Sequence, residues 1–332
     1  MKKLVLLFAA LSSFSVAAQQ SVNIYSYRQA FLVDPVVEQF TKDTGIKVNV
    51  LFAKQGLAER LEREGEHTKA DVVMTTDISR LMEITNRGLT QSVENKTIFE
   101  NIPAHLRDPK NQWFALTTRV RNIYASKDRV GKIDISYEDL ASEKFKGKIC
   151  TRSGKHPYSV ALVSSMISHH GEAETKKWLQ GVKANLARKP QGNDRAQVKA
   201  IKEGLCDISI GNGYYFGKML ADKNQKAWAD SVHILFPNQK DRGAHVNVSG
   251  MALTKHAPNK EAAIRLMEYL SSANAQKIYA EANMEYPVKP GVAYSPLVAS
   301  WGEYKADNLE MAKIAANREK AMKLIDEVKF DL

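Results

Sequence analysis

Two adjacent tyrosines are the most specific chemical feature of this sequence. Tyr214 and Tyr215 lie in the segment GNGYYFG (211–217), where a predicted strand ends at Ile210, glycines turn the chain and a helix begins. Adjacent residues at a helix start point about 100° apart, so both rings can face one cleft above the N-terminus. The helix dipole favours negative charge there, which would help the phenols to ionise. Two ordinary interfacial tyrosines are the alternative interpretation.

A third phenol occupies a similar position elsewhere in the chain. Tyr158 follows the turn RSGKHP (152–157), in which Pro157 suits the first position of a helix. Tyr158 is therefore also expected at a helix start, with its ring directed toward a cleft.

Polar residues at the ends of two predicted strands could line the same cleft. Tyr27, Arg28 and Gln29 end the first strand, where open α/β sheets carry their cleft residues. Alternation along a later strand places Arg119 and Arg121 on one face. A pair of solvated edge charges is the alternative for these arginines.

The motifs of common enzyme classes are missing from the sequence. It contains no G-x-S-x-G elbow, H-E-x-x-H helix, P-loop or dinucleotide glycine fingerprint. His169 and His170 lie near Glu172, but a solvated helix end before Gly171 explains them better than a metal cluster.

The N-terminus predicts export. Lys2 and Lys3 precede an apolar run from Leu4 to Val16, and small residues then place cleavage after Ala18. The run is too short for a stop-transfer segment, so residues 1–18 are expected to be a signal peptide and the mature protein to be periplasmic. Loss of the two lysines lowers the formal charge from +11 to +9. The basic residues are dispersed along the chain and not gathered into one groove, which argues against nucleic acid as a partner.

The two cysteines, Cys150 and Cys206, are informative in an oxidising compartment, where free thiols are unusual. A disulfide is the favoured interpretation, and two buried thiols are the alternative. Neither cysteine lies beside a plausible base in the sequence, so we expect a structural role.

Strands and helices alternate along the chain, which predicts a largely parallel sheet covered on both faces. The strands are expected at 22–27, 46–52, 70–75, 148–152 and 207–210. The helices are expected at 57–64, 78–86, 158–169, 197–203, 214–223, 260–271 and 273–282, with one more before Gly45. The long β-rich stretch 113–127 looks like a strand that leaves one lobe and enters another, and 232–236 followed by 245–253 gives another extended crossing.

Two α/β lobes joined by long strands form a hinge, and a hinge creates a cleft that can close on a ligand. About 310 mature residues suit two domains of ordinary size. The organisation therefore predicts a binding protein and not an enzyme. A periplasmic hydrolase with an unrecognised nucleophile and a purely structural protein are the alternatives from other classes.

The chain resembles the periplasmic ferric-ion-binding proteins, the substrate-binding components of bacterial iron ABC importers with a transferrin-like lobe. The resemblance covers essentially the whole mature chain and rests on YSYRQ, ADVVMTTDISR, WFALTTRVR, RSGKHPYS, the long segment ending in GNGYYFGKML, and EYPVKPGV. It implies an α/β type II periplasmic-binding-protein fold with a hinged cleft. The expected lobes are 21–118 plus 247–297 and 119–246 plus 298–332.

The resemblance also implies the site. The family's paired tyrosine ligands correspond to Tyr214 and Tyr215, and the third tyrosine of one subgroup corresponds to Tyr158. Gln29 replaces a histidine ligand of other subgroups, Ala30 a tyrosine, and Thr76 a glutamate ligand, so a three-tyrosine site is expected. By the same resemblance, Arg119 and Gln29 should hold a synergistic anion, with Tyr27, Arg28, Thr76 and Asp77 as further cleft residues.

The chemistry of this ligand set suits Fe(III), a hard ion that prefers anionic oxygen and can displace protons from phenols. Three phenolates cancel its charge, and a bidentate carbonate or similar anion would fill two more positions, balanced by Arg119. The expected partners are a ferric ion or chelate and an inner-membrane ABC permease, and we expect a monomer. The rival within binding proteins is an organic or oxyanion metabolite, such as thiamine or a phosphonate.

Overall fold

The structure, a computed structural model, describes residues 20–332; the predicted signal peptide and its cleavage site lie outside this range. Its strands are β1 (Ser21–Ser26), β2 (Lys47–Phe52), β3 (Val72–Thr75), β4 (Phe114–Ser126), β5 (Ile149–Cys150), β6 (Ile208–Asn212), β7 (Val232–Leu235), β8 (Val246–Leu253) and β9 (Tyr286–Pro287).

The α-helices are α1 (Ala30–Thr44), α2 (Leu57–Glu64), α3 (Ile78–Asn86), α4 (Lys96–Asn101), α5 (Pro157–Ala184), α6 (Asp194–Lys202), α7 (Gly213–Ala221), α8 (Lys226–Asp230), α9 (Lys260–Ser271), α10 (Ala273–Asn283), α11 (Pro296–Ala299), α12 (Met311–Ala316) and α13 (Arg318–Glu327). Short 3-10 helices lie at Gly65–His67, Ala104–Leu106, Glu138–Ala141 and Glu143–Phe145.

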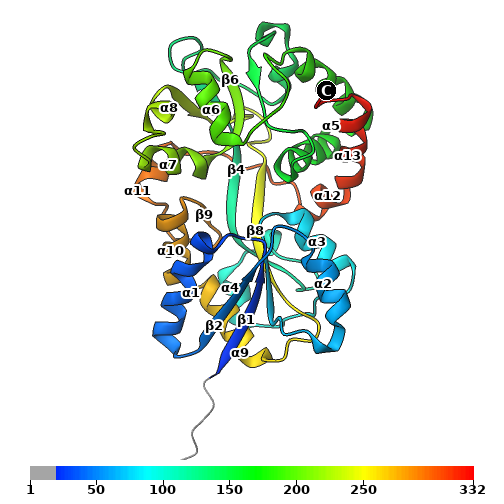
Figure 1. Cartoon of the computed structure of the whole chain (residues 1–332), viewed down its shortest axis with the longest axis vertical. Coiled ribbons are helices and arrows are strands. Elements are labelled where there is room, and N and C mark those ends of the chain that lie inside the picture. Colours follow the sequence, from blue (N-terminus) through cyan, green and yellow to red (C-terminus); the bar gives the residue numbers. More distant parts are fainter. Residues whose placement is uncertain (1–19) are drawn as a thin grey trace, which may run out of the picture.

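The chain forms two lobes joined by two long strands, β4 and β8 (Figure 1). The lower lobe contains β1, β2 and β3 with α1 to α4, α9 and α10, and the upper lobe contains β5 and β6 with α5 to α8 and α13. The strand order is β2-β1-β3-β8-β4-β6-β5, so the crossing strands join the sheets of both lobes. The two-lobe type II binding-protein fold predicted from the sequence is confirmed.

The local sequence explains most of these elements. In α1 the residues at helical spacing, Val33, Val36, Val37 and Phe40, are the buried ones, and Gly45 ends the helix in the left-handed conformation (φ 72°). All residues of β4 and β8 are buried, as expected for strands at the centre of the molecule.

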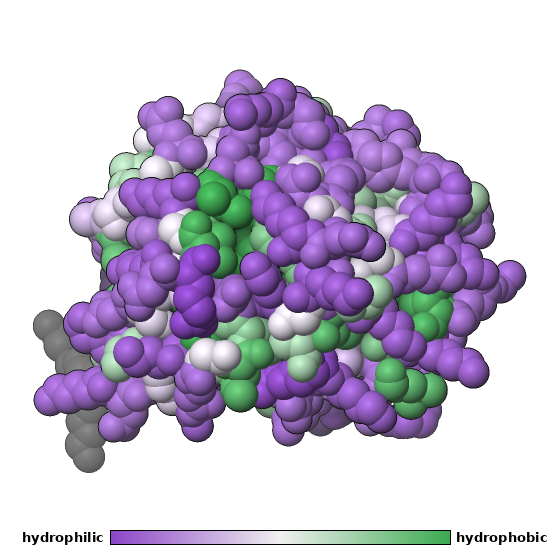
Figure 2. Space-filling view, turned by 90° about the horizontal axis from the view of Figure 1, so that it is seen from above, coloured by the Kyte–Doolittle hydropathy of each residue, from purple (hydrophilic) through white to green (hydrophobic). Residues whose placement is uncertain are grey.

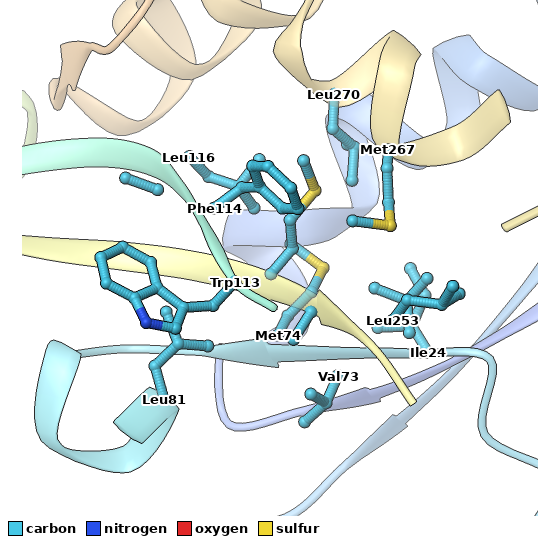
Figure 3. Close-up of a cluster of buried hydrophobic side chains, with 14 of the residues drawn as sticks. Ile24, Val73, Met74, Leu81, Trp113, Phe114, Leu116, Leu253, Met267 and Leu270 are labelled. Atoms are coloured by element: carbon cyan, nitrogen blue, oxygen red, sulfur yellow. The ribbon is translucent and has the colours of Figure 1, made fainter. Parts of the chain in front are cut away.

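Each lobe has its own hydrophobic core. The lower core packs β1, β3, β4 and β8 against α3 and α9, through residues such as Ile24, Met74, Phe114, Leu253 and Leu270 (Figure 3). Two clusters fill the upper lobe, one under α5 and α13 and one under α6 and α7. A smaller cluster, which includes Val120, Val246 and Tyr286, lies where the strands cross and is called the hinge cluster below.

Two details differ from the sequence-based expectation. The sheet is mixed and not largely parallel. Within the lobes, β1 pairs parallel with β2 and β3, and β5 pairs parallel with β6. The crossing strands run antiparallel to their neighbours: β8 to β3, β4 to β6, and β4 to β8. The helix expected to end near His169 continues to Ala184 beyond a break at Gly171, whose φ of 76° is left-handed. Glycine adopts this conformation without a steric penalty, so the chain can bend there and resume a helix.

The surface seen from above is mostly hydrophilic, with small hydrophobic patches between polar side chains (Figure 2). Within residues 20–332, no helix is long and apolar enough to cross a membrane.

Candidate metal-binding site

The paired tyrosines lie where the sequence predicted, on the first turn of α7 directly after β6. The glycines before them permit close packing against β4: a Cβ at Gly211 would collide with the ring of Tyr124, and one at Gly213 would lie 2.8 Å from Nδ2 of Asn122. The hydroxyl of Tyr124 also donates a hydrogen bond to the carbonyl of Asn212 (2.7 Å). The turn that presents Tyr214 and Tyr215 is thereby held on the central strand.

The third tyrosine reaches the same point from a separate helix start. Pro157 opens α5, and the Nδ1 atom of His156 accepts a hydrogen bond from the backbone N–H of Tyr158 (3.2 Å). The hydroxyl oxygens of Tyr158 and Tyr214 are 3.2 Å apart, and the rings of Tyr214 and Tyr215 have centroids 4.2 Å apart. Oxygens at this spacing can bind one small cation together.

Burial makes these phenols hard to ionise without a cation. It raises the pKa of Tyr214 well above the ordinary value and also raises that of Tyr215, and the neighbouring Tyr158 adds to both shifts. The helix start therefore does not outweigh desolvation, contrary to the sequence-based argument. A bound cation must supply the energy to remove the protons.

The three tyrosines line one cavity of about 450 Å³ between the lobes. Three more of the predicted cleft residues, Tyr27, Gln29 and Thr76, also line it. Gln29 precedes α1, and its side chain makes no cap hydrogen bond to the helix. The other residues on its wall, to which the sequence analysis assigned no role, are Phe31, Leu32, Asn193, Arg195 and Lys218.

Arg28 and Arg119 do not line this cavity but share a buried carboxylate beside it. Nη2 of Arg28 lies 2.7 Å from Oε2 of Glu285, and Nη1 of Arg119 lies 3.5 Å from Oε1. Arg119 also donates to the carbonyls of Thr76 and Val248. Burial alone would raise the pKa of Glu285, but the two guanidinium groups outweigh it and hold this pKa below its ordinary value. We call this set the lower triad.

A second set, again two arginines around one buried carboxylate, lies in the upper lobe and is called the upper triad. Asp194 accepts from Nη1 of Arg121 (2.6 Å) and of Arg152 (2.9 Å), and from the backbone N–H of Asn212 (3.0 Å). This last bond ties the upper triad to the turn before Tyr214.

Tyr158 lies between the two triads. The guanidinium carbons of Arg119, Arg121 and Arg152 are 5.7, 5.8 and 5.4 Å from its ring centroid. The arginines are buried and not solvated edge charges. Positive charge gathered around this ring favours the approach of anions.

Two of the predicted cleft residues, Tyr27 and Asp77, have structural partners in the lower lobe. The hydroxyl of Tyr27 accepts from the backbone N–H of Leu57 (2.9 Å), and its ring lies under the guanidinium of Arg80 (4.2 Å). Asp77 caps α3 by accepting from the backbone N–H of Arg80 (3.1 Å).

The predicted disulfide between Cys150 and Cys206 is confirmed, with Cα atoms 5.8 Å apart. It joins Cys150, the last residue of β5, to Cys206, which lies two residues before the start of β6. The loop that it closes contains α5, whose first turn carries Tyr158.

Comparison with known proteins agrees with this geometry. Residues 67–301 match the family model of the bacterial extracellular solute-binding proteins. The chain belongs to this family. It is 41% identical to iron uptake protein A1 of Synechocystis, over 93% of this chain and 87% of that protein. Its resemblance to the ferric-ion-binding proteins is thereby confirmed.

Solved structures of similar proteins show the same fold. An apo ferric ion-binding protein A of Pasteurella haemolytica is 55% identical with a TM-score of 0.90, over 94% of this chain and 99% of that one. A Trichodesmium protein in complex with iron and citrate ligands is 40% identical with a TM-score of 0.89, over 93% and 99% of the two chains.

The site residues of this solute-binding protein that sequence reasoning missed lie mostly inside motifs that it had noticed. Lys218 follows the tyrosine pair in GYYFGK, Asn193 and Arg195 flank the upper-triad Asp194 in QGNDRA, and Glu285 opens EYPVKPGV. No local pattern assigned these residues a role, because their partners lie far away in the sequence.

Proposed function

We propose that this protein captures Fe(III) through the phenolate oxygens of Tyr158, Tyr214 and Tyr215 and delivers it to an ABC-type permease of the inner membrane. The observation that carries the proposal is the meeting of three phenols from two helix starts at one interlobe cavity, with 3.2 Å between two of their oxygens. The iron-binding relatives support it independently.

The ligand set explains both capture and release. Fe(III) is hard and carries three charges, which three phenolates neutralise. Because burial raises the pKa of Tyr214 and Tyr215, these phenols hold their protons until the ion arrives. Binding therefore releases protons, and acid promotes loss of the metal.

A synergistic anion completes this proposal. Carbonate or a similar anion would occupy the positions that the phenolates leave open, with Arg119 and the side chain of Gln29 as its contacts. Nε of Arg119 has no hydrogen-bond partner among the described residues, although the two Nη atoms of its guanidinium are engaged. Gln29 faces the cavity.

The wider setting follows from the family. Its members are extracellular solute-binding proteins, which are transport components. For this chain we propose a periplasmic monomer with no catalytic role, which carries a ferric ion or a ferric chelate. We also propose that the lobes comprise residues 21–118 plus 247–297 and residues 119–246 plus 298–332.

The experiment is iron loading followed by visible spectroscopy and challenge with citrate. Phenolate-to-iron charge transfer should give the loaded protein a strong colour. A Tyr214→Phe/Tyr215→Phe variant removes only the ligand oxygens, so it should lose the colour and retain no iron against citrate. Tyr158→Phe should release iron faster than the wild type.

Tyr279→Phe is the matched control, because Tyr279 is a buried tyrosine in the lower core, away from the cavity walls. It should bind iron like the wild type. A colourless iron-loaded protein, or a double variant that still holds Fe(III) against citrate, would contradict the proposal and favour an organic or oxyanion metabolite.

A further inference from the structure

The helix that carries the paired tyrosines also touches the lower lobe. Lys218 lies one turn after Tyr214 on α7, and its Nζ atom donates to the carbonyl of Ala282 (2.9 Å), near the C-terminus of α10. The last carbonyls of a helix lack partners within the helix and attract positive charge. Lys218 thus supplies the cation that this helix end favours.

A glycine permits this approach. A Cβ atom at Gly217 would collide with Sδ of Met284 and lie 3.4 Å from Cδ2 of Leu297. Met284 itself ends α10 in the left-handed conformation (φ 57°), which directs the chain from α10 toward β9. The absence of a side chain at Gly217 therefore allows α7 to lie directly on this turn.

The two helices belong to different lobes. Phe216 and Met219 of α7 pack into an upper-lobe cluster, whereas Ala275 and Tyr279 of α10 pack into the lower core. The contact between Gly217–Lys218 and residues 282–284 therefore joins the two lobes. Lys218 lines the interlobe cavity, and Met284 also packs against the hinge cluster.

The segment 282–285 contacts the other lower-lobe elements of the site as well. Nδ2 of Asn283 donates to the carbonyl of Leu32 in α1 (3.0 Å). Glu285 holds Arg28 and Arg119 in the lower triad. One short segment thus connects α7, α1 and the crossing strand β4, each of which carries or adjoins a site residue.

We propose that Gly217 and Lys218 dock the tyrosine helix onto residues 282–284, and that this interlobe contact, named the α7–α10 latch, sets the rate at which iron leaves. Lys218 is a positioning residue and not a ligand. The inference rests on the proposed function of iron capture.

The first test compares two cavity cations. Lys218→Met removes the bond to Ala282 and keeps the length of the side chain. It should speed iron loss to citrate about tenfold or more, the order expected for a lost hydrogen bond to a charged group. The charge-transfer band should keep its position, because the phenolates are untouched. Arg195→Met is the matched control, since Arg195 lines the cavity but contacts Gln225 of the upper lobe (3.5 Å).

The second test disrupts the α7–α10 contact by adding a side chain at Gly217, without changing any charge. Gly217→Leu introduces a better helix former, so α7 itself should stay helical, but the new side chain should push the helix off Met284 and speed release to a similar extent. Adding Met284→Ala in the same chain makes room for the new side chain and should restore slow release. Such a rescue requires that the two residues press on each other, which a loss of cavity charge does not produce.

The outcomes separate the latch from the proposed function. If the wild type loads iron with a visible band but all the variants release it at the wild-type rate, the latch is wrong and iron capture stands. A second pattern would also contradict the latch. If Arg195→Met and Lys218→Met both release iron fast while Gly217→Leu releases it slowly, the positive charge of the cavity and not the interlobe contact controls release. If the wild type shows no band, the proposed function itself fails.

Discussion

Glu285 is the residue on which two of the arginines near the site depend. It is 2% exposed and lies between the buried guanidinium groups of Arg28 and Arg119. Loss of Glu285 would leave both guanidinium groups buried without a counter-charge, whereas loss of one arginine leaves Glu285 paired with the other. Arg119 therefore has two functions that an experiment must separate, because it stabilises Glu285 and is the proposed contact of the anion.

Substitution of each arginine separates these functions. Arg119→Ala and Arg28→Ala each remove one of the two arginines that contact Glu285 and leave the other in place. Each should therefore lower the free energy of unfolding by about 1.5 to 3 kcal/mol, the contribution of a hydrogen bond to a charged group. Only Arg119→Ala should weaken iron retention and abolish its dependence on carbonate. Urea unfolding and iron retention with and without bicarbonate provide the measurements.

Arg28→Ala serves as the matched control for stability in this pair. Equal carbonate dependence in both variants and the wild type would exclude Arg119 as the anion contact. Arg121, whose guanidinium lies 5.8 Å from the ring of Tyr158, or backbone donors would then be the next candidates.

The residues of the site differ in how far the sequence could predict them. The tyrosines follow from local patterns, because a strand, a glycine turn and a helix start are adjacent in the chain. Strand alternation also placed Arg119 and Arg121 on one face, and both guanidinium groups lie beside Tyr158. Glu285 and Lys218 could not be assigned in this way, since their partners are brought to them only by the packing of the two lobes.

At the scale of elements, the C-terminal segment holds the turn before Tyr158. The carboxylate of Asp331, shortly after α13, accepts from Oγ of Ser153 (2.6 Å) and from the backbone N–H of Gly154 (2.7 Å). A Cβ at Gly154 would lie 2.8 Å from the ring of Phe330, so the segment packs closely on this turn. The end of the chain thus fixes the element that presents a proposed ligand.

Asp331→Ala should loosen this turn without touching the cavity. Because it leaves the N–H of Gly154 and the hydroxyl of Ser153 without their acceptor, we expect unfolding to become easier by about 1 to 3 kcal/mol. Iron release should also become faster, with the visible band unchanged in position. Stopped-flow release to citrate and urea unfolding measure the two effects.

Asp326→Ala is the control for this prediction, because Asp326 pairs with Lys155 of the same turn but both side chains are more than half exposed. An exposed pair contributes at most about 1 kcal/mol, so this variant should release iron like the wild type. Equal effects of the two substitutions would show that Asp331 has no special role in placing Tyr158.

Most elements could be predicted because their patterns are local. The helices α2, α3 and α9 have the bounds that apolar periodicity predicted, and their ends coincide with polar or glycine residues. The pairing directions of β3 and β6 could not be predicted, since they depend on which strands return from the other lobe. The continuation of α5 beyond Gly171 depends on α12 and α13, which pack against it from the end of the chain.

At the scale of the whole molecule, the two crossing strands determine how the lobes can move. Their length and alternation predicted two crossings, and the structure confirms them in β4 and β8. A Cβ at Gly250 of β8 would lie 2.6 Å from Leu81 and 2.9 Å from the carbonyl of Phe114, so these strands also pack closely into the lower lobe. The hinge cluster adds residues from β9 and α11, a gathering that no local pattern could predict.

A buried histidine at this crossing links the global stability to pH. His245 precedes β8, is 2% exposed and lies near the charges of Arg121 and Arg242. Burial, with these two guanidinium groups, lowers the pKa of His245 to about 3. Its backbone carbonyl accepts from the N–H of Arg121 (3.1 Å), so the residue is fixed to β4, which carries one arginine of each triad.

The sign of the pH effect follows from the proton count. Between the ordinary histidine pKa of about 6.5 and the folded value, the unfolded chain binds a proton at His245 that the folded protein does not. Stability is therefore lost as the pH falls below about 6.5, and this residue alone should remove about 2 kcal/mol between pH 7 and pH 5. His245→Gln replaces the histidine with a neutral side chain, so the loss of unfolding free energy between pH 7 and pH 5 should shrink by that amount.

Urea unfolding at the two pH values measures this loss. His105→Gln is the control, because His105 is exposed, and it should leave the loss unchanged. An equal loss in His245→Gln and the wild type would show that this histidine does not couple the hinge to pH.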